Sequence, residues 1–256
     1  TYTTLATLIK YPFGSGAYPD KPKYGFFQSE RSTFKKIAEK LKLEKISDDP
    51  LQYARHPLVY IVEAADDICY EIMDIEDAHK LKILDKTQTF NLLEGFFDET
   101  RDAEFYEKRG QVFAEVTDLN ERVAYLRASV INKLVNITAR IFLDHQQEIL
   151  SGTFSGSLMD HLPEHEQQAF ERCKKLAVKD IYNDRSVVKI ELTGFNVLST
   201  LLNEFTYAVR SPGSQYARKL LSMIPDQYTV QKGTLYERIR SVIDFISGMT
   251  DLYAVD

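Results

Sequence analysis

The chain has 256 residues, of which 44% are hydrophobic, and a net charge of −6 from 32 basic and 38 acidic residues. This acidic balance excludes a dedicated nucleic-acid-binding protein, which would carry a basic surface. The two cysteines, Cys69 and Cys173, form no Cys-x-x-Cys pair, so we expect neither a cysteine zinc site nor a disulfide scaffold, and we expect a reducing, cytoplasmic location. No run of 18 apolar residues occurs, so we expect no membrane span.

The first residues of the chain carry no initiator Met, no basic region and no signal-type apolar stretch. We therefore expect the sequence to begin inside a longer protein. Between residues 11 and 25, three prolines and three glycines predict an irregular loop. A short helix is predicted at 32–43, and the break at 48–50 is expected to start a further helix.

From residue 56 to 77 the pattern is strongly helical, with Pro57 suited to a first helical turn. Apolar spacing predicts further helices at 87–97, 101–115, 118–150, 164–182, 192–209, 213–224 and 234–253. The best strand candidate is 187–192, and it is short. The sequence therefore predicts an all-α fold, with a core at 1–150 and a helical C-terminal region at 151–256 packed on that core.

Residues 58–74 form the most informative segment. At about 100° per residue, Glu63, Asp66, Asp67, Tyr70 and Asp74 share one stripe of the helix, while the rest of its surface is mostly apolar. A helix that is apolar around most of its circumference is usually buried. Buried carboxylates need a cation, a metal or hydrogen-bond donors, because burying an unpaired charge costs several kcal/mol.

Two interpretations of this acidic stripe follow from the pattern. In the first, the carboxylates hold a divalent metal, since hard cations prefer oxygen ligands. In the second, the helix is amphipathic and its stripe faces water. Three acidic residues of the same helix that do not belong to the stripe, Glu71, Glu76 and Asp77, are expected to face solvent.

The run Glu63-Ala64-Ala65-Asp66-Asp67-Ile68, followed by Tyr70 and Asp74, resembles the dGTPase group of HD-domain phosphohydrolases. Other segments resemble the same family in the same order: 10–12, 23–27, 132–135, 152–154, 190–195 and 246–254. The resemblance implies an HD-domain-like helical bundle with additional C-terminal helices. It also implies an enzyme that hydrolyses dGTP, or other deoxynucleoside triphosphates, to the deoxynucleoside and tripolyphosphate.

In this family two histidines and two aspartates hold the metal, and the first histidine and a His-Asp dipeptide come early in the chain. None of the five histidines here is followed by Asp. By this resemblance the chain is a C-terminal portion whose bundle is incomplete at its N-terminal side, and three of the four metal ligands and the catalytic residues are expected upstream of Thr1. The cofactor is expected to be Mg²⁺ or Mn²⁺, with Fe, Co, Ni and Zn as alternatives.

The resemblance also implies roles for individual residues. Asp66 matches the last metal ligand, and Asp67 is the alternative if the register is off by one. Tyr70 is expected beside the sugar, and Asp74 is expected to accept a hydrogen bond from the 3′-hydroxyl. The predicted phosphate donors are Lys10, Tyr11 and Lys23; Lys21 is equally basic and close by, and Tyr182 and Glu191 are placed at the base end of the pocket.

The family resemblance further implies a homo-oligomer, such as a hexamer, with single-stranded DNA as a regulator. Two alternatives stay open at this point. One is another HD-type nucleotide phosphohydrolase, such as a nucleotidase. The other is a catalytically inactive fragment that binds nucleotides or mediates oligomerisation.

Overall fold

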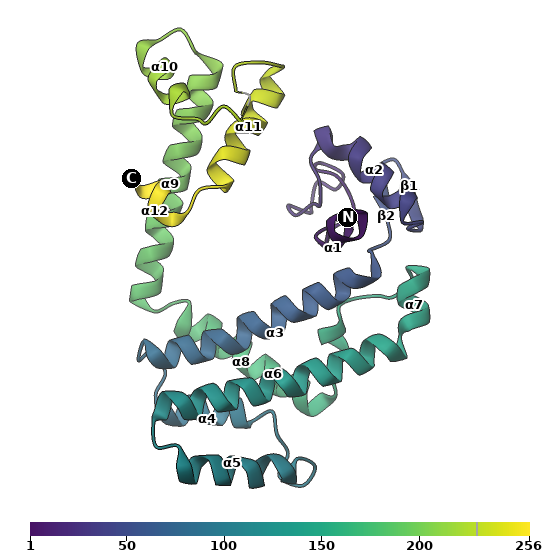
Figure 1. Cartoon of the computed structure of the whole chain (residues 1–256), viewed down its shortest axis with the longest axis vertical. Coiled ribbons are helices and arrows are strands. Elements are labelled where there is room, and N and C mark those ends of the chain that lie inside the picture. Colours follow the sequence, from purple (N-terminus) through teal and green to yellow (C-terminus); the bar gives the residue numbers. More distant parts are fainter. Residues whose placement is uncertain (229) are drawn as a thin grey trace. The chain divides into compact units, whose positions relative to one another are not determined.

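The computed structural model describes residues 1–228 and 230–256, which form two compact units, Thr1–Tyr182 and Asn183–Asp256 (Figure 1). The predicted all-α class is confirmed, because the described residues are mainly helical and their one sheet has two strands. The predicted division into a core at 1–150 and a C-terminal region at 151–256 stays a prediction. No helix among the described residues is both long and apolar enough to cross a membrane.

The first unit contains eight α-helices, one β-hairpin and three short helical turns. They are α1 (Tyr2–Thr7), η1 (Gln28–Glu30), α2 (Arg31–Lys40), β1 (Lys45–Asp48), β2 (Leu51–Tyr53), α3 (Pro57–Lys80), α4 (Lys86–Glu94), α5 (Ala103–Glu115), α6 (Leu119–Asp144), α7 (Gln146–Ser151), η2 (Leu158–His161), α8 (Glu164–Leu176) and the π-helical turn η3 (Ala177–Ile181). The loop predicted at 11–25 forms no regular element.

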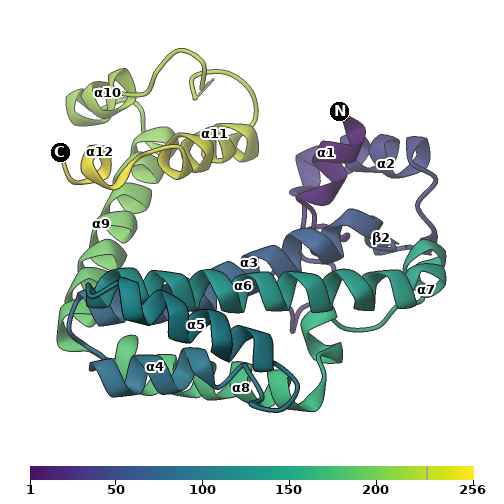
Figure 2. The same cartoon turned by 60° about the horizontal axis from the view of Figure 1, so that its bottom comes forward.

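The core of this unit lies where the long helices α3 and α6 pack side by side, with α4 and α8 against them (Figures 1 and 2). On α3, Ile68, Ile72 and Ile75 are fully buried at spacings of four and three residues, as an amphipathic helix requires. Leu126 and Leu134 of α6 are buried in the same cluster. This packing fixes the face that α3 turns away from the core.

The second unit is built on α9 (Arg185–Arg210), against which α10 (Gln215–Ser222), α11 (Leu235–Ser247) and α12 (Asp251–Val255) pack. Its core is a separate cluster that includes Phe205, Val242 and Phe245. The strand suggested at 187–192 is wrong, because these residues lie inside α9. The Asp184 side chain accepts a hydrogen bond from the backbone N–H of Ser186 and so caps this helix.

The start of α3 also differs from expectation. The break at 48–50 does not open a helix but turns the chain between β1 and β2, which pair as an antiparallel hairpin. Leu51 and Tyr53 of β2 are buried against Phe26 and Phe34, whose rings stack with centroids 4.4 Å apart. The hairpin and the N-terminal loop thereby form a small layer beside the first turns of α3.

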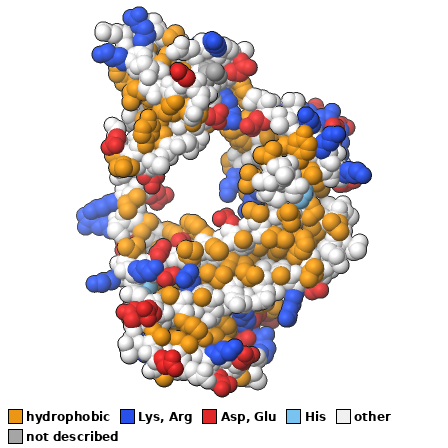
Figure 3. Space-filling model, in the orientation of Figure 1, with side chains coloured by type: hydrophobic (Ala, Val, Ile, Leu, Met, Phe, Trp, Pro, Cys, Tyr) orange, Lys and Arg blue, Asp and Glu red, His pale blue; other side chains and the backbone are white. Residues whose placement is uncertain are grey.

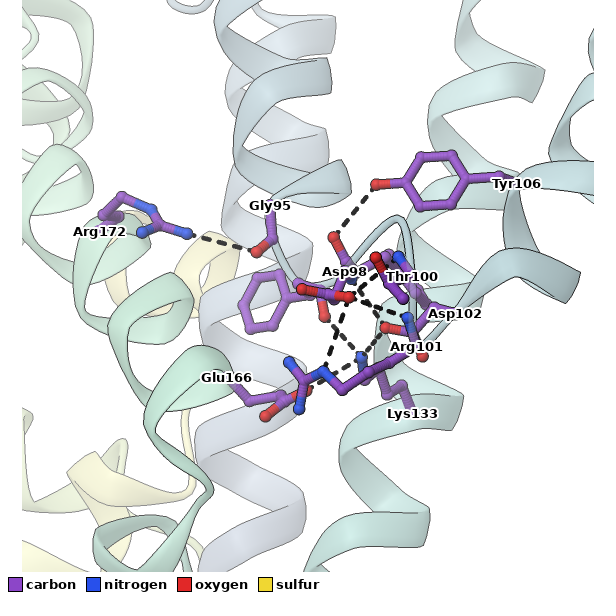
Figure 4. Close-up of polar contacts among 11 residues, drawn as sticks. Gly95, Asp98, Thr100, Arg101, Asp102, Tyr106, Lys133, Glu166 and Arg172 are labelled. Atoms are coloured by element: carbon purple, nitrogen blue, oxygen red, sulfur yellow. Dashed lines mark hydrogen bonds and ion pairs between the residues drawn. The ribbon is translucent and has the colours of Figure 1, made fainter.

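A partly buried ion-pair network joins the loop between α4 and α5 to two other helices (Figure 4). The Lys133 ammonium of α6 lies 2.6 Å from Asp102 and 3.0 Å from Glu166 of α8, and it donates a hydrogen bond to the Phe96 carbonyl. The Glu166 side chain is almost completely buried. Lys133 therefore compensates two carboxylates where three elements meet.

One part of α3 is less buried than its composition predicts. Leu58, Ile61, Val62 and Met73 are each 40–45% exposed, because no described element covers this side of the helix. Figure 3 shows apolar side chains gathered along α3 and α6. A largely apolar groove of about 320 Å³ runs between the two helices, with Ile61 among its lining residues.

Candidate functional site

The acidic stripe of α3 lies on the side of the helix turned away from α6. Asp66 is exposed, Asp67 and Asp74 are half-buried, and the Tyr70 ring is 60% exposed. Glu63, at the start of the stripe, is buried. The stripe thus changes from a buried end near the helix N-terminus to an accessible middle.

At the far end of the stripe, Asp74 is held by Tyr182, the residue that directly follows η3. The Tyr182 hydroxyl donates a hydrogen bond of 2.7 Å to one carboxylate oxygen of Asp74. The ring centroids of Tyr70 and Tyr182 lie 6.4 Å apart, so the two aromatic rings are neighbours beside that carboxylate. Burial, followed by the hydrogen bond to Asp74, raises the pKa of Tyr182, so its hydroxyl stays protonated as a donor.

At the near end of the stripe, Glu63 binds two cations from two other segments. The Lys10 Nζ lies 2.8 Å from one carboxylate oxygen, and the Arg55 guanidinium lies 3.1 Å from the other. Lys10 follows α1, whereas Arg55 lies between β2 and α3. The hydrogen bond to Glu63 is the largest cause that raises the pKa of Lys10, so its ammonium is held in the charged form.

These cations border a cavity of about 380 Å³ beside the first turns of α3. Lys10, Lys21 and Arg55 line it, together with Tyr11 and Tyr60, and the described residues that line it include no acidic side chain. Its volume lies within the range of small-molecule sites. The cavity is therefore suited to a small anion.

The structure brings together only part of the predicted phosphate-binding set. Lys10 and Tyr11 line the cavity, but Lys23 is exposed in the loop and is not among the lining residues. Lys21 lines it instead, 4.8 Å above the Tyr18 ring. Sequence reasoning missed Arg55; the available signal was a cation two residues before a helix that carries an acidic stripe.

Glu191, the residue predicted at the base end of the pocket, lies on α9 in the second compact unit, where its side chain is exposed. Tyr182 lies in the first unit and contacts Asp74. The role of both residues in binding the base stays a prediction.

Two expectations about acidic residues on α3 are wrong. Glu71 and Glu76 do not face solvent but are buried. Glu76 lies 2.6 Å from Arg127 of α6 and 3.0 Å from Lys80, and these two cations compensate its charge. The third residue, Asp77, is exposed as predicted.

The metal site implied by the family resemblance is not complete among the described residues. They contain no group of three or more His, Cys, Asp or Glu side chains that could hold a metal ion. Asp66 offers one exposed carboxylate, whereas protein sites for divalent metals use several ligands. Burial raises the pKa of the neighbouring Asp67, against the lowering effect of Lys10. The residues present therefore fit one ligand of such a site and not the whole of it.

Comparison with known proteins gives relatives along the whole chain. A protein of Pseudomonas aeruginosa (strain LESB58) named deoxyguanosinetriphosphate triphosphohydrolase-like protein is 34% identical over 100% of this chain and 58% of its own length. A protein of the same name from Synechocystis sp. is 34% identical over 99% of this chain and 57% of its own length. The deoxyguanosinetriphosphate triphosphohydrolase of Yersinia enterocolitica is 28% identical over 100% of this chain and 58% of its own length.

A family model described as a phosphohydrolase-associated domain matches residues 161–256. The chain spans somewhat more than half the length of the curated relatives that it matches. These matches agree with the order of the motifs along the sequence, and they confirm the resemblance of the chain to deoxyguanosinetriphosphate triphosphohydrolases and the proteins named after them.

Proposed function

We propose that the protein to which this chain belongs hydrolyses a deoxynucleoside triphosphate, with dGTP favoured, to the deoxynucleoside and intact tripolyphosphate. The observation that carries the proposal is the arrangement along α3. Tyr70 and Asp74 form a sugar-binding end. Asp66 lies about two helical turns closer to the N-terminus of α3, and the cations that bind Glu63 lie nearer still to that terminus. At a rise of about 1.5 Å per residue, Asp74 and Glu63 lie roughly 16 Å apart along the helix axis.

At the sugar end, Asp74 accepts a hydrogen bond from the 3′-hydroxyl of the deoxyribose. One of its oxygens accepts a hydrogen bond from the Tyr182 hydroxyl, and an ionised carboxylate has further lone pairs for a second donor. Tyr182 thereby holds the Asp74 carboxylate in one orientation. Tyr70, with its ring exposed beside Asp74, packs against the sugar.

At the phosphate end, Lys10 and Tyr11 donate hydrogen bonds to the polyphosphate in the cavity beside α3. A triphosphate carries about four negative charges, so charged donors there contribute both binding energy and orientation. Because Lys10 is linked to α3 through Glu63, its ammonium has a fixed position relative to Asp66.

A divalent metal, Mg²⁺ or Mn²⁺, belongs to the proposal through the family and not through a site among the described residues. Asp66 would supply one of its ligands. In this family the metal would activate water or polarise the α-phosphate.

A homo-oligomer, a cytoplasmic location and regulation by single-stranded DNA are further parts of the proposal. Each has a direct test: the mass of the complete protein in solution, its location in fractionated cells, and the rate of dGTP hydrolysis with and without single-stranded DNA. A monomeric protein whose rate does not respond to DNA would contradict the first and third.

The reaction type is tested by the phosphorus-containing product. The complete protein is incubated with dGTP and Mg²⁺ or Mn²⁺, the phosphates are followed by ³¹P NMR, and the nucleoside is quantified by chromatography. Tripolyphosphate and deoxyguanosine in equal amounts are the expected result. Release of orthophosphate or pyrophosphate would point to another nucleotide phosphohydrolase, and no product with either metal would favour the non-catalytic alternative.

A further inference from the structure

We infer that Arg55 is a phosphate-contacting residue of the same cavity and that Glu63 is a positioning residue that holds Arg55 and Lys10 there together. This inference rests on the proposed function and assigns residues that the family resemblance did not. It follows from the contacts of Glu63, from those of Arg55 and from the charge of the cavity.

Glu63 connects separate parts of the chain. Its side chain is only 8% exposed, and its two oxygens bind Lys10 and Arg55 separately. A buried carboxylate with two cationic partners is fully compensated, so it fixes both of them to the first turns of α3. The two cations come from segments 45 residues apart, and the contact with Glu63 brings them to one place.

The Arg55 guanidinium is held from three sides. Besides Glu63, its NH1 group donates to the Gly156 carbonyl at 3.3 Å, and the guanidinium lies 5.5 Å from the Tyr60 ring centroid. Both hydrogen bonds use the same terminal nitrogen. A guanidinium has five N–H donors in a rigid fork, and that fork matches the geometry of phosphate oxygens. Arg55 therefore lines the cavity with donors that its protein partners do not use.

The charges in this region do not cancel. Glu63 and Asp67, whose carboxylate also acts on Lys10, contribute at most two negative charges, whereas Lys10, Arg55 and Lys21 contribute three positive charges. An ion pair with a purely structural role would be balanced by one cation. The excess of positive charge, in a cavity that is also lined by three tyrosines, favours a polyanion as its occupant.

The test measures binding of two probes to the complete protein by calorimetry: inorganic tripolyphosphate and deoxyguanosine. Arg55→Gln should weaken tripolyphosphate binding by roughly tenfold or more, as expected for loss of a charge-assisted contact. Glu63→Gln should weaken it by a similar factor, because Lys10 and Arg55 lose their common partner. Deoxyguanosine affinity should stay within about twofold in both variants, since the sugar end of α3 is unchanged. A merely structural role would weaken both probes together.

Arg140→Gln is the matched control, because Arg140 is exposed on α6 and lines a different hollow. It should bind tripolyphosphate as the wild type does. The inference is overturned if Arg55→Gln keeps wild-type tripolyphosphate affinity, or if Arg140→Gln loses as much. If the wild type releases tripolyphosphate from dGTP while Arg55→Gln binds it normally, the inference fails and the proposed function stands. A wild type that neither releases nor binds tripolyphosphate contradicts both.

Discussion

At the scale of single residues, Glu71 shows how tertiary packing changes a side chain that the helical pattern left unremarkable. It lies on α3, is buried, and its Oε1 has no hydrogen-bond partner among the described residues. Burial raises the pKa of Glu71 to about 7, a rise that Lys174 opposes and that Asp74, Glu171 and Asp67 reinforce. Its protonation therefore affects stability near neutral pH.

The raised pKa of Glu71 gives a pH-dependent prediction. The folded protein binds the Glu71 proton more tightly than the unfolded chain, so the associated stability is fully present below about pH 4.5 and is lost as pH rises through about 7. Glu71→Gln stays neutral and avoids that loss. Its advantage in free energy of unfolding should grow from near zero at pH 4.5 to on the order of 2 kcal/mol at pH 8. Urea denaturation at both pH values measures this, and equal stability at pH 8 would refute it.

The hydrogen bond between Tyr182 and Asp74 gives a second prediction at this scale. Tyr182→Phe removes the donor and should lower the free energy of unfolding by about 1–2 kcal/mol, because hydrogen bonds to charged groups are stronger than neutral ones. The chain offers a matched control in Tyr216, whose hydroxyl donates to Glu204 at 2.9 Å in an exposed position. Tyr216→Phe should cost less than about 0.5 kcal/mol. If thermal unfolding shows equal losses of free energy of unfolding in the two variants, the hydrogen bond to Asp74 stabilises the fold no more than an exposed one does.

Residues such as Arg55 and Glu76 mark the limit of prediction from the sequence. The helical pattern placed Glu63 on the same stripe as Asp66 and Asp74, because that depends only on the spacing along one helix. It could not show that Arg55 and Lys10 meet at Glu63, or that Arg127 of α6 compensates a buried Glu76. Those contacts depend on how distant segments pack.

At the scale of elements, long helices with periodic apolar residues were predictable and short or ambiguous segments were not. The predicted helix at 56–77 is α3, because its apolar residues recur with the helical period. The hairpin β1–β2 was missed because its strands are only four and three residues long. The residues at 187–192 resembled a strand through their valines and isoleucine, yet they belong to the capped helix α9.

The network around Lys133 gives the prediction that belongs to this scale. Lys133→Met removes the cation closest to the buried Glu166 and the half-buried Asp102, leaving Glu166 with Arg101 at 3.9 Å, and should cost about 3 kcal/mol in free energy of unfolding. Lys108→Met is the matched control, because Lys108 pairs with Glu104 at 2.7 Å in an exposed i, i+4 position. It should cost about 0.5 kcal/mol or less. Chemical denaturation distinguishes the two, and similar small losses would show that the network does not hold the α4–α5 loop.

At the scale of the whole molecule, the described residues contain the acidic stripe of α3 but no group of three or more His, Cys, Asp or Glu side chains that could hold a metal ion. Its relatives are longer than the chain, which spans 57–58% of those compared here. The fold class and the order of the motifs were predictable from the sequence. The partial burial of α3 was not, because it depends on what covers Leu58, Ile61, Val62 and Met73, and no described element does.

The stripe on α3 is proposed to bind the substrate, with Asp74 at the sugar end. The most direct measurement is kcat/KM for dGTP in the complete protein, compared between wild type, Asp74→Asn and Glu107→Gln, an exposed carboxylate on α5. Loss of a charge-assisted hydrogen bond should lower kcat/KM by roughly 10- to 100-fold in Asp74→Asn. Glu107→Gln should leave it unchanged. An Asp74→Asn variant that folds and retains wild-type kcat/KM would show that the Asp74 carboxylate does not bind the substrate.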